Sequence, residues 1–153
     1  MTHIHKIFSA MFMLLTVIGL WSCEKEESAS PIVETMAVTY ASIHGVWQVE
    51  QINDWELEEE TFCYINFNRS ERTFTSYDNL ASMYGRERSG SFSIEQDEYG
   101  RYILNGSYDY GSGDWATAYE VTMAASGEEM TWRSLTTDEL VHYVRTEAMP
   151  EHE

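Results

Sequence analysis

Apolar and polar residues alternate with a period of two along most of the chain from Gly45 onward. This period is typical of β-strands that bury one face. Turn signals rich in Gly, Asp, Asn and Ser interrupt the alternation about every 8 to 15 residues, as in β-sandwiches and β-barrels. The expected strands are Val46–Asn53, Thr61–Asn68, Arg72–Tyr77, Gly90–Gln96, Arg101–Leu104, Trp115–Ala124, Met130–Leu135 and Leu140–Arg145.

Short connections between these segments favour pairing of neighbouring strands. Asp97–Gly100 and Ala125–Glu128 each contain a glycine for a hairpin turn. Asn105 and Gly106 form a further hairpin signal, which would add a short strand over Ser107–Tyr110. We therefore predict an all-β fold, an eight-stranded up-and-down antiparallel barrel, because closure removes the exposed edges of a flat sheet.

The alternation also assigns the inward side chains of the barrel. An eight-stranded barrel has an interior just wide enough to be filled by side chains or to hold one small ligand. Since the inward residues are bulky, we expect a mostly filled interior. They are Trp47, Val49, Cys63, Ile65, Phe67, Phe92, Ile94, Tyr119, Val121, Met123, Met130, Trp132, Val141 and Tyr143.

The first 22 residues resemble the signal of an exported lipoprotein. A weakly basic start precedes the apolar run Ile7–Leu20, which is shorter than the roughly 20 residues of a membrane span. Leu20, Ser22 and Cys23 resemble the lipobox of bacterial lipoproteins, whereas Trp21 departs from it. The resemblance implies a lipoprotein signal that is cleaved after Ser22, and lipidation of Cys23.

The chain after this signal divides into three parts. The charged and small residues that follow Cys23 predict a flexible tether over residues 23–42. A helix over Ile32–Ile43 is a weak alternative, because β-branched residues disfavour it. The barrel would then occupy residues 43–146, and residues 147–153 would be a polar tail.

Lipidation would make a membrane the partner of this protein. Acyl chains on Cys23 anchor strongly, because each buried CH₂ contributes about 0.8 kcal/mol. The acidic run Glu24–Glu27 also resembles the surface-export signal of lipoproteins in some Gram-negative bacteria, and a solvated spacer is the alternative. We expect a lipid anchor in the outer membrane, with the barrel facing the periplasm or the cell surface.

Composition excludes one class of partner. The chain has 26 acidic against 9 basic residues and a net charge of −17 at pH 7. Nucleic-acid binding requires basic groups that release counterions from phosphates, so no nucleic-acid partner is expected. A high net charge also keeps a protein soluble and separate, which favours a monomer.

No residue pattern predicts catalysis, a cofactor or a metal. Cys63 lies in an apolar strand without a neighbouring cation, so we interpret it as buried and inert. His44, His142 and His152 lack metal-ligand spacing, and the acidic segment 56–60 lacks the order of a calcium loop. We therefore expect a non-enzymatic protein with no cofactor.

Gly45 and Trp47 open the first expected strand, and Arg145 closes the last. This arrangement resembles the lipocalin and wider calycin signature, in which the arginine covers the tryptophan at the closed end of the barrel. Over residues 43–146 the chain is similar to the short lipocalin-like lipoproteins of Gram-negative bacteria. It lacks the long helix after the barrel and the disulfide of full-length lipocalins, which argues against a large ligand cavity.

The longest expected connection, Asp78–Ser89, suggests a ligand site at the barrel rim. We predict that Leu80, Met83 and Tyr84 contact the apolar part of a small hydrophobic or amphiphilic ligand. Arg86 and Arg88 would hold its anionic end. The alternative is that the two arginines pair with neighbouring carboxylates.

Two functions remain open at this point. The first is non-catalytic binding of such a ligand, which a continuous cavity above about 300 Å³ would favour. The second is a cell-surface protein-interaction module with a filled barrel, as an accessory to an uptake complex or an enzyme inhibitor. Phe62 and Tyr64 are expected on the outer face, either as partner anchors or as ordinary cross-strand pairs.

Overall fold

The computed structural model describes residues 33–151, and these residues contain strands and no helix. The predicted signal, Cys23, the first part of the tether and His152 lie outside the described residues. None of the described segments is a helix long and apolar enough to cross a membrane. The strands are β1 (Thr35–Met36), β2 (Gly45–Ile52), β3 (Trp55–Glu56), β4 (Cys63–Asn68), β5 (Thr73–Asp78), β6 (Arg86–Gln96), β7 (Tyr102–Tyr108), β8 (Tyr119–Ala124), β9 (Glu129–Ser134) and β10 (Leu140–Thr146).

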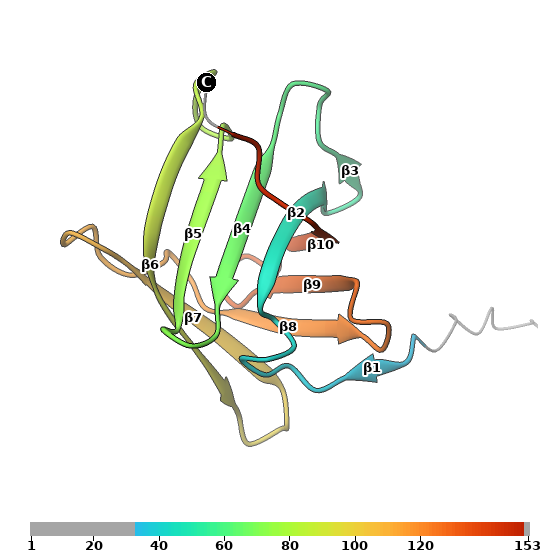
Figure 1. Cartoon of the computed structure of the whole chain (residues 1–153). Coiled ribbons are helices and arrows are strands. Elements are labelled where there is room, and N and C mark those ends of the chain that lie inside the picture. The colour runs from blue at the N-terminus through green and yellow to red at the C-terminus, as the bar shows by residue number, and fades with distance from the viewer. Residues whose placement is uncertain (1–32, 152–153) are drawn as a thin grey trace, which may run out of the picture. The chain divides into compact units, whose positions relative to one another are not determined.

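Eight of these strands close into an antiparallel barrel, which confirms the predicted fold. The hydrogen-bonded order is β8-β7-β6-β5-β4-β2-β10-β9, and β9 pairs again with β8. In Figure 1, β2, β4, β5 and β6 stand side by side, and β8, β9 and β10 cross the opposite side of the molecule. Short β1 and β3 pair outside this ring, with β8 and β2 respectively.

The structure differs from the sequence prediction at β6 and β7. Strand β6 begins at Arg86 rather than Gly90, so the preceding connection is only residues 79–85. Asn105 lies inside β7, and the predicted hairpin there is wrong. Its neighbour Gly106 makes room for an indole instead, since a Cβ there would lie 2.1 Å from the ring of Trp115.

Trp115 precedes β8 rather than opening it, yet it completes the barrel wall. Strand β7 pairs with β8 only through residues 102–104. Beyond that point the Trp115 amide donates to the Gly106 carbonyl (2.8 Å), and Asp114 bridges to Ser107. The ring of Trp115 stacks on that of Trp132 at 5.6 Å between centroids. The loop before β8 therefore packs an aromatic side chain against the core.

The described part of the expected tether, residues 33–42, packs on the barrel. Thr35 and Met36 pair with the end of β8, and Val38 is buried. No helix forms there, because the segment turns at residues 40–42 and leads into buried Ile43. The ordered unit thus begins N-terminal to residue 43.

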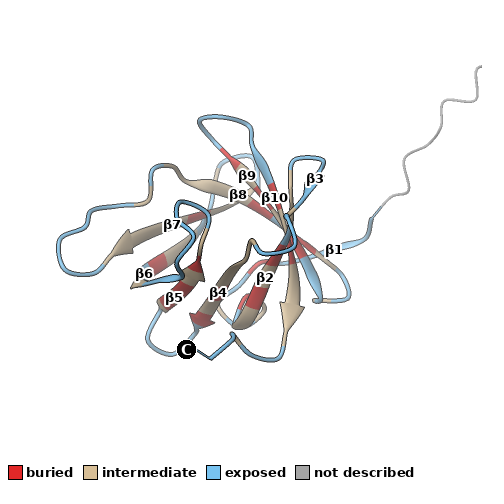
Figure 2. Cartoon of the chain, turned by 90° about the horizontal axis from the view of Figure 1, so that it is seen from above, coloured by how far each residue is buried: buried red, intermediate tan, exposed pale blue. Residues whose placement is uncertain are grey.

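The core fills the middle of the barrel and follows the predicted inward positions. Trp47, Phe67, Leu104, Met123 and Met130 are almost completely inaccessible. Figure 2, a view turned by 90° from Figure 1, shows buried segments on strands all around the barrel and exposed connections at their ends. Cys63, Ile94 and Tyr119 also face this core but remain partly accessible.

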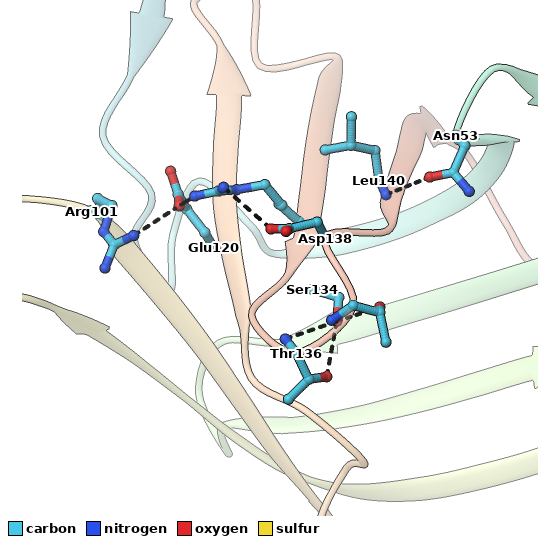
Figure 3. A network of polar contacts seen from close by, with 9 residues as sticks. Asn53, Arg101, Glu120, Ser134, Thr136, Asp138 and Leu140 are labelled. Carbon is cyan, nitrogen blue, oxygen red and sulfur yellow. Dashed lines mark hydrogen bonds and ion pairs between the residues drawn. The ribbon is translucent and has the colours of Figure 1, made fainter.

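Charged side chains stabilise the outer face of β7, β8 and β9. The carboxylate of Glu120 accepts from Arg133 and, at 3.5 Å, from Arg101 (Figure 3). Arg133 also reaches Asp138 in the β9–β10 connection at 3.6 Å. Since these groups are partly exposed, water and salt screen each pair and its contribution to stability is small.

Candidate functional site

One end of the barrel is closed by Trp47 and Arg145. The guanidinium carbon of Arg145 lies 4.2 Å from the centre of the Trp47 ring. Its three nitrogens, Nε, Nη1 and Nη2, donate to the carbonyls of Gly127, His44 and Ser42 at 2.7–2.9 Å. The indole N–H of Trp47 donates to the Ile43 carbonyl at 2.8 Å. Each side-chain nitrogen of the pair therefore donates a hydrogen bond, which suits a structural role.

Gly45 is required beside this pair. Its φ of +110° is a conformation that residues with a Cβ rarely adopt. A Cβ at this position would also lie 3.0 Å from Arg145 Nη1. The three residues predicted to form the signature thus meet at the closed end.

The opposite end of the barrel carries the longer connections. Because strand direction alternates around the ring, β2–β4, β5–β6, β7–β8 and β9–β10 are all joined at this end. A cavity of about 230 Å³ lies inside the barrel below these connections. It is lined by Val49, Ile52, Cys63, Ile65, Phe74, Ser76, Asp78, Leu80, Arg88, Tyr108, Trp115, Ala116, Tyr119, Trp132, Glu139, Val141 and Tyr143.

A buried carboxylate, paired with two partly exposed arginines, forms the polar wall of this cavity. Asp78, the last residue of β5, is only 2 % exposed. Its carboxylate accepts from Arg88 Nη2 at 2.6 Å and lies 3.7 Å from Arg86 Nη2. Arg86 and Arg88 are brought to it by β6, which pairs directly with β5 in this region.

Arg88 makes a second polar contact inside the wall. Its Nη1 donates to the hydroxyl of Tyr108 at 3.1 Å. The third nitrogen of this guanidinium, Nε, is the only buried side-chain nitrogen or oxygen among the described residues without a hydrogen-bond partner. Burial alone would lower the pKa of Arg88, but the hydrogen bond to Asp78 and the charge interactions with Tyr108, Asp78 and Cys63 together raise it. Arg88 therefore stays charged.

Three further polar groups of the cavity, those of Cys63, Tyr119 and Tyr143, remain protonated. Burial, followed by the nearby Asp78, raises the pKa of Cys63 to about 12. Burial also raises the pKa of Tyr119 and Tyr143 above the ordinary tyrosine range. These groups face the cavity as neutral donors, and the Cys63 thiol is unreactive near neutral pH.

The five predicted ligand-binding residues occupy different places. Leu80 and Arg88 line the cavity. Tyr84 and Arg86 line a smaller surface hollow that shares Asp78 with it. Met83 is 89 % exposed in the β5–β6 connection. The expected free arginine pair is absent, because both guanidinium groups contact Asp78.

The sequence reasoning missed Asp78, Tyr108 and Trp115 as parts of this site. Asp78 had a readable signal, since it shares strand parity with the inward Phe74 and Ser76. Trp115 was placed on a strand, and its position depends on a contact with Gly106 that is invisible in the local pattern.

Two larger hollows, of about 510 and 600 Å³, lie outside the barrel core along β6 and β7. Ser, Gly and Asp residues contribute much of their lining, and both are more open to solvent than the cavity. Among residues 33–151, no group of three His, Cys, Asp or Glu side chains could hold a metal ion. The cavity inside the barrel is therefore the best candidate site.

The rim around the cavity is acidic and partly apolar. The connections 53–62, 79–85, 109–118 and 135–139 contain no Lys or Arg. They carry nine carboxylates, Asp54, Glu56, Glu58, Glu59, Glu60, Asp109, Asp114, Asp138 and Glu139. Large exposed apolar or aromatic side chains in the same connections are Trp55, Leu80, Met83, Tyr84, Tyr110 and Leu135.

Comparison with known proteins gives one result. The family model described as the lipocalin-like domain matches residues 43–132, from two residues before β2 to the middle of β9. The matched range includes Gly45, Trp47, Asp78 and Arg88, while Arg145 lies beyond it. Neither the curated proteins nor the solved structures compared with this chain gave a match.

Proposed function

The chain belongs to the lipocalin-like domain family, and from this premise we propose that its barrel binds a small hydrophobic ligand without catalysing a reaction. The ligand would enter between the connections at the open end and lie among the aromatic side chains of the cavity. The observation that carries this proposal is the 230 Å³ cavity that the bulky inward residues leave unfilled.

The size of this cavity limits the ligand. Pockets for drug-sized molecules usually measure about 300–1,000 Å³, whereas an apolar cavity of about 150 Å³ holds benzene. A volume of 230 Å³ therefore suits one or two fused rings. A long-chain fatty acid is too large to be enclosed.

Titration of an aromatic probe tests this function. Residues 23–153 with Cys23→Ala contain every strand and core residue of the described barrel, and ¹⁵N labelling resolves their indole N–H signals. Added 2-acetylnaphthalene should shift the signals of Trp115 and Trp132 saturably, because both rings line the cavity. Trp55, which is 78 % exposed at the rim, serves as the internal control.

A cavity-filling variant completes the test. Ser76 is buried and lines the cavity, so Ser76→Met should occupy its volume and abolish the saturable shifts. Thr75→Met, on the outward face of the same strand, should leave them unchanged. Equal binding by wild type and Ser76→Met would contradict the proposal.

The proposed location of this function is the outer membrane. Cys23 follows the lipobox-like residues and would carry the acyl chains. Radiolabelled palmitate should enter the full-length chain and not Cys23→Ala. Fractionation of the producing cells should then find the wild type with the outer membrane. Equal labelling of both proteins would remove the lipid anchor from the proposal.

The second candidate function is binding of a positively charged protein at the open end. It is favoured by the nine carboxylates and the exposed aromatic side chains of the rim. A lysine-rich peptide should then bind the wild type and lose affinity in a Trp55→Ala/Tyr110→Ala variant. Ser76→Met should not affect it, since this partner does not enter the cavity. Saturable binding of the aromatic probe inside the barrel would favour the first function.

A further inference from the structure

The cavity has two chemically different sides. Arg88 on β6 forms an ion pair with Asp78 on the neighbouring β5, and the second arginine near Asp78, Arg86, is not part of the lining. Strand β10 is four strands away from β6 in either direction around the ring, so these two strands lie on opposite sides of the barrel. Glu139 immediately precedes β10 and lines the cavity on that opposite side. A ligand therefore meets a compensated ion pair on one side and a single carboxylate on the other.

The carboxylate of Glu139 has no cation as a partner. Within residues 33–151 it forms no ion pair. Its charge nevertheless reaches the cavity: burial raises the pKa of Tyr119, a lining residue, and the negative charge of Glu139 is the next cause of the increase. Glu139 is also exposed, so a cation beside it keeps part of its hydration and loses little free energy by desolvation.

Hydrogen bonds hold the backbone of Glu139 at the mouth of the barrel. Its carbonyl accepts from the Ser134 amide at 2.9 Å, and the following amide, that of Leu140, donates to the side chain of Asn53 at 3.0 Å. Ser134 is buried, and its hydroxyl oxygen accepts from the Thr136 amide (Figure 3). The β9–β10 connection is therefore a hydrogen-bonded turn that fixes the point from which the carboxylate extends.

Aromatic rings line the cavity on the same side as Glu139. Tyr119, Trp132 and Tyr143 belong to β8, β9 and β10, and successive ring centroids lie 5.2 and 4.6 Å apart. All three rings contribute to the lining. Aromatic side chains pack against the apolar body of a ligand and also attract cations. This side of the cavity therefore suits an aromatic ligand with a positive charge.

The two ends of the barrel differ in charge in the same sense. The connections at the open end contain nine carboxylates and no Lys or Arg. The connections at the closed end, residues 69–72, 97–101 and 125–128, contain three arginines and four carboxylates. A negative potential at the mouth raises the local concentration of cations and lowers that of anions.

We propose that the cavity binds a small organic cation, an aromatic body that carries one ammonium group. The rings would lie inside the barrel, and the ammonium group would lie beside Glu139 at the mouth. This rests on the proposed function and specifies the class of its hydrophobic ligand. It replaces the anionic amphiphile expected from the sequence, because the two arginines that would hold the anion both contact Asp78.

Three probes with the same naphthalene ring test the charge preference. 2-Naphthylmethylamine is an ammonium ion at neutral pH, 2-naphthylmethanol is uncharged, and 2-naphthoate is an anion. Each is titrated into residues 23–153 with Cys23→Ala, with the indole signals of Trp115 and Trp132 as the readout. At about 20 mM salt we expect the ammonium ion to bind about fivefold more tightly than the alcohol and at least about tenfold more tightly than the anion. At about 500 mM salt its preference over the alcohol should fall to within about twofold.

Glu139→Gln tests the carboxylate itself. Glutamine keeps the size of the side chain and removes its charge, so the preference for the ammonium ion over the alcohol should fall to within about twofold, while the affinity for the alcohol stays unchanged. Glu98→Gln is the matched control, because it removes an equal charge from an exposed position in the β6–β7 hairpin at the closed end. This control should keep the full preference.

The cavity-filling variant Ser76→Met locates the bound cation. Since Ser76 lines the cavity, this variant should lose binding of the ammonium ion and of the alcohol together. Saturable binding of the ammonium ion that survives in Ser76→Met would place the cation on the outer rim and overturn the proposal.

The outcomes distinguish this proposal from the function on which it rests. If none of the three probes binds the wild type, the proposed function itself is contradicted. If the alcohol binds but the ammonium ion binds no more tightly, or the anion binds equally well, only the proposed ligand class is overturned. If Glu139→Gln keeps the full preference, the role of Glu139 is overturned.

Discussion

Arg145 lies flat over the indole of Trp47, with 4.2 Å between the guanidinium carbon and the ring centre, although 97 residues of sequence separate them. Strands β2 and β10 bring the two together, since Trp47 and Arg145 are direct cross-strand partners. The arginine also donates hydrogen bonds to three backbone carbonyls at the closed end. This contact joins the first and last long strands of the barrel.

The effects of replacing Trp47 and Arg145 on the free energy of unfolding should be strongly coupled. Trp47→Ala should lower the free energy of unfolding by about 3–5 kcal/mol, because it removes a fully buried aromatic side chain. Arg145→Ala should cost less alone, and the double variant should cost less than the sum by about 0.5–3 kcal/mol. Urea unfolding of the four proteins measures this coupling, and strict additivity would contradict it.

Gly106 should be intolerant of a side chain. Gly106→Ala places a Cβ against the ring of Trp115, so overpacking should cost about 1–3 kcal/mol. The displaced indole should also change the near-ultraviolet circular dichroism of the cavity. Asn105→Ala, on the opposite face of β7, is the control and should leave the spectrum unchanged.

Stability should fall as pH rises from about 9 to 12. Folding raises the pKa of Cys63 from its ordinary value of 9.0 to about 12, so the unfolded chain releases this proton first and is favoured in that range. The raised pKa values of Tyr119 and Tyr143 act in the same direction at higher pH. Urea unfolding between pH 8 and 11 should show a shallower decline for Cys63→Ala than for the protein that retains this thiol. Parallel declines would assign the effect to the tyrosines alone.

Removing only Arg88 from its ion pair with the buried Asp78 should destabilise the barrel more than removing both residues. Arg88→Met leaves the Asp78 carboxylate buried with only the more distant Arg86, at a cost of about 2–3 kcal/mol. The double variant Asp78→Leu/Arg88→Met removes both charges and should recover most of this loss. Chemical denaturation of the two variants decides the point. A double variant less stable than Arg88→Met would show that the pair stabilises the barrel by itself.

The barrel could be predicted from the sequence because its signals are local and repeated. Alternation placed Trp47, Ile65 and Trp132 inward, and each is buried. The roles of Gly45 and Arg145 could be predicted because they belong to a known signature whose residues lie far apart in the chain. The Asn105-Gly106 signal failed, since the glycine serves a contact with Trp115 rather than a turn.

The site was less predictable, because it depends on contacts between strands rather than on local sequence signals. Arg86 and Arg88 were identified as unusual cations, but their strand was taken for a loop. Only the register of β5 against β6 shows that they meet Asp78. Whether a barrel keeps a cavity depends on how its side chains pack in three dimensions, which residue size alone does not reveal. The mostly filled interior expected from the sequence nevertheless retains about 230 Å³.

The central claim is that a small aromatic ligand lies inside the barrel, and intermolecular nuclear Overhauser effects test it most directly. Isotope-labelled protein is mixed with unlabelled 2-acetylnaphthalene, and contacts to assigned methyl groups are recorded. The account predicts contacts from the ligand to the methyls of Val49, Ile65 and Val141, which line the cavity. Contacts confined to Leu135 and other exposed rim side chains, or no contacts at all, would contradict it.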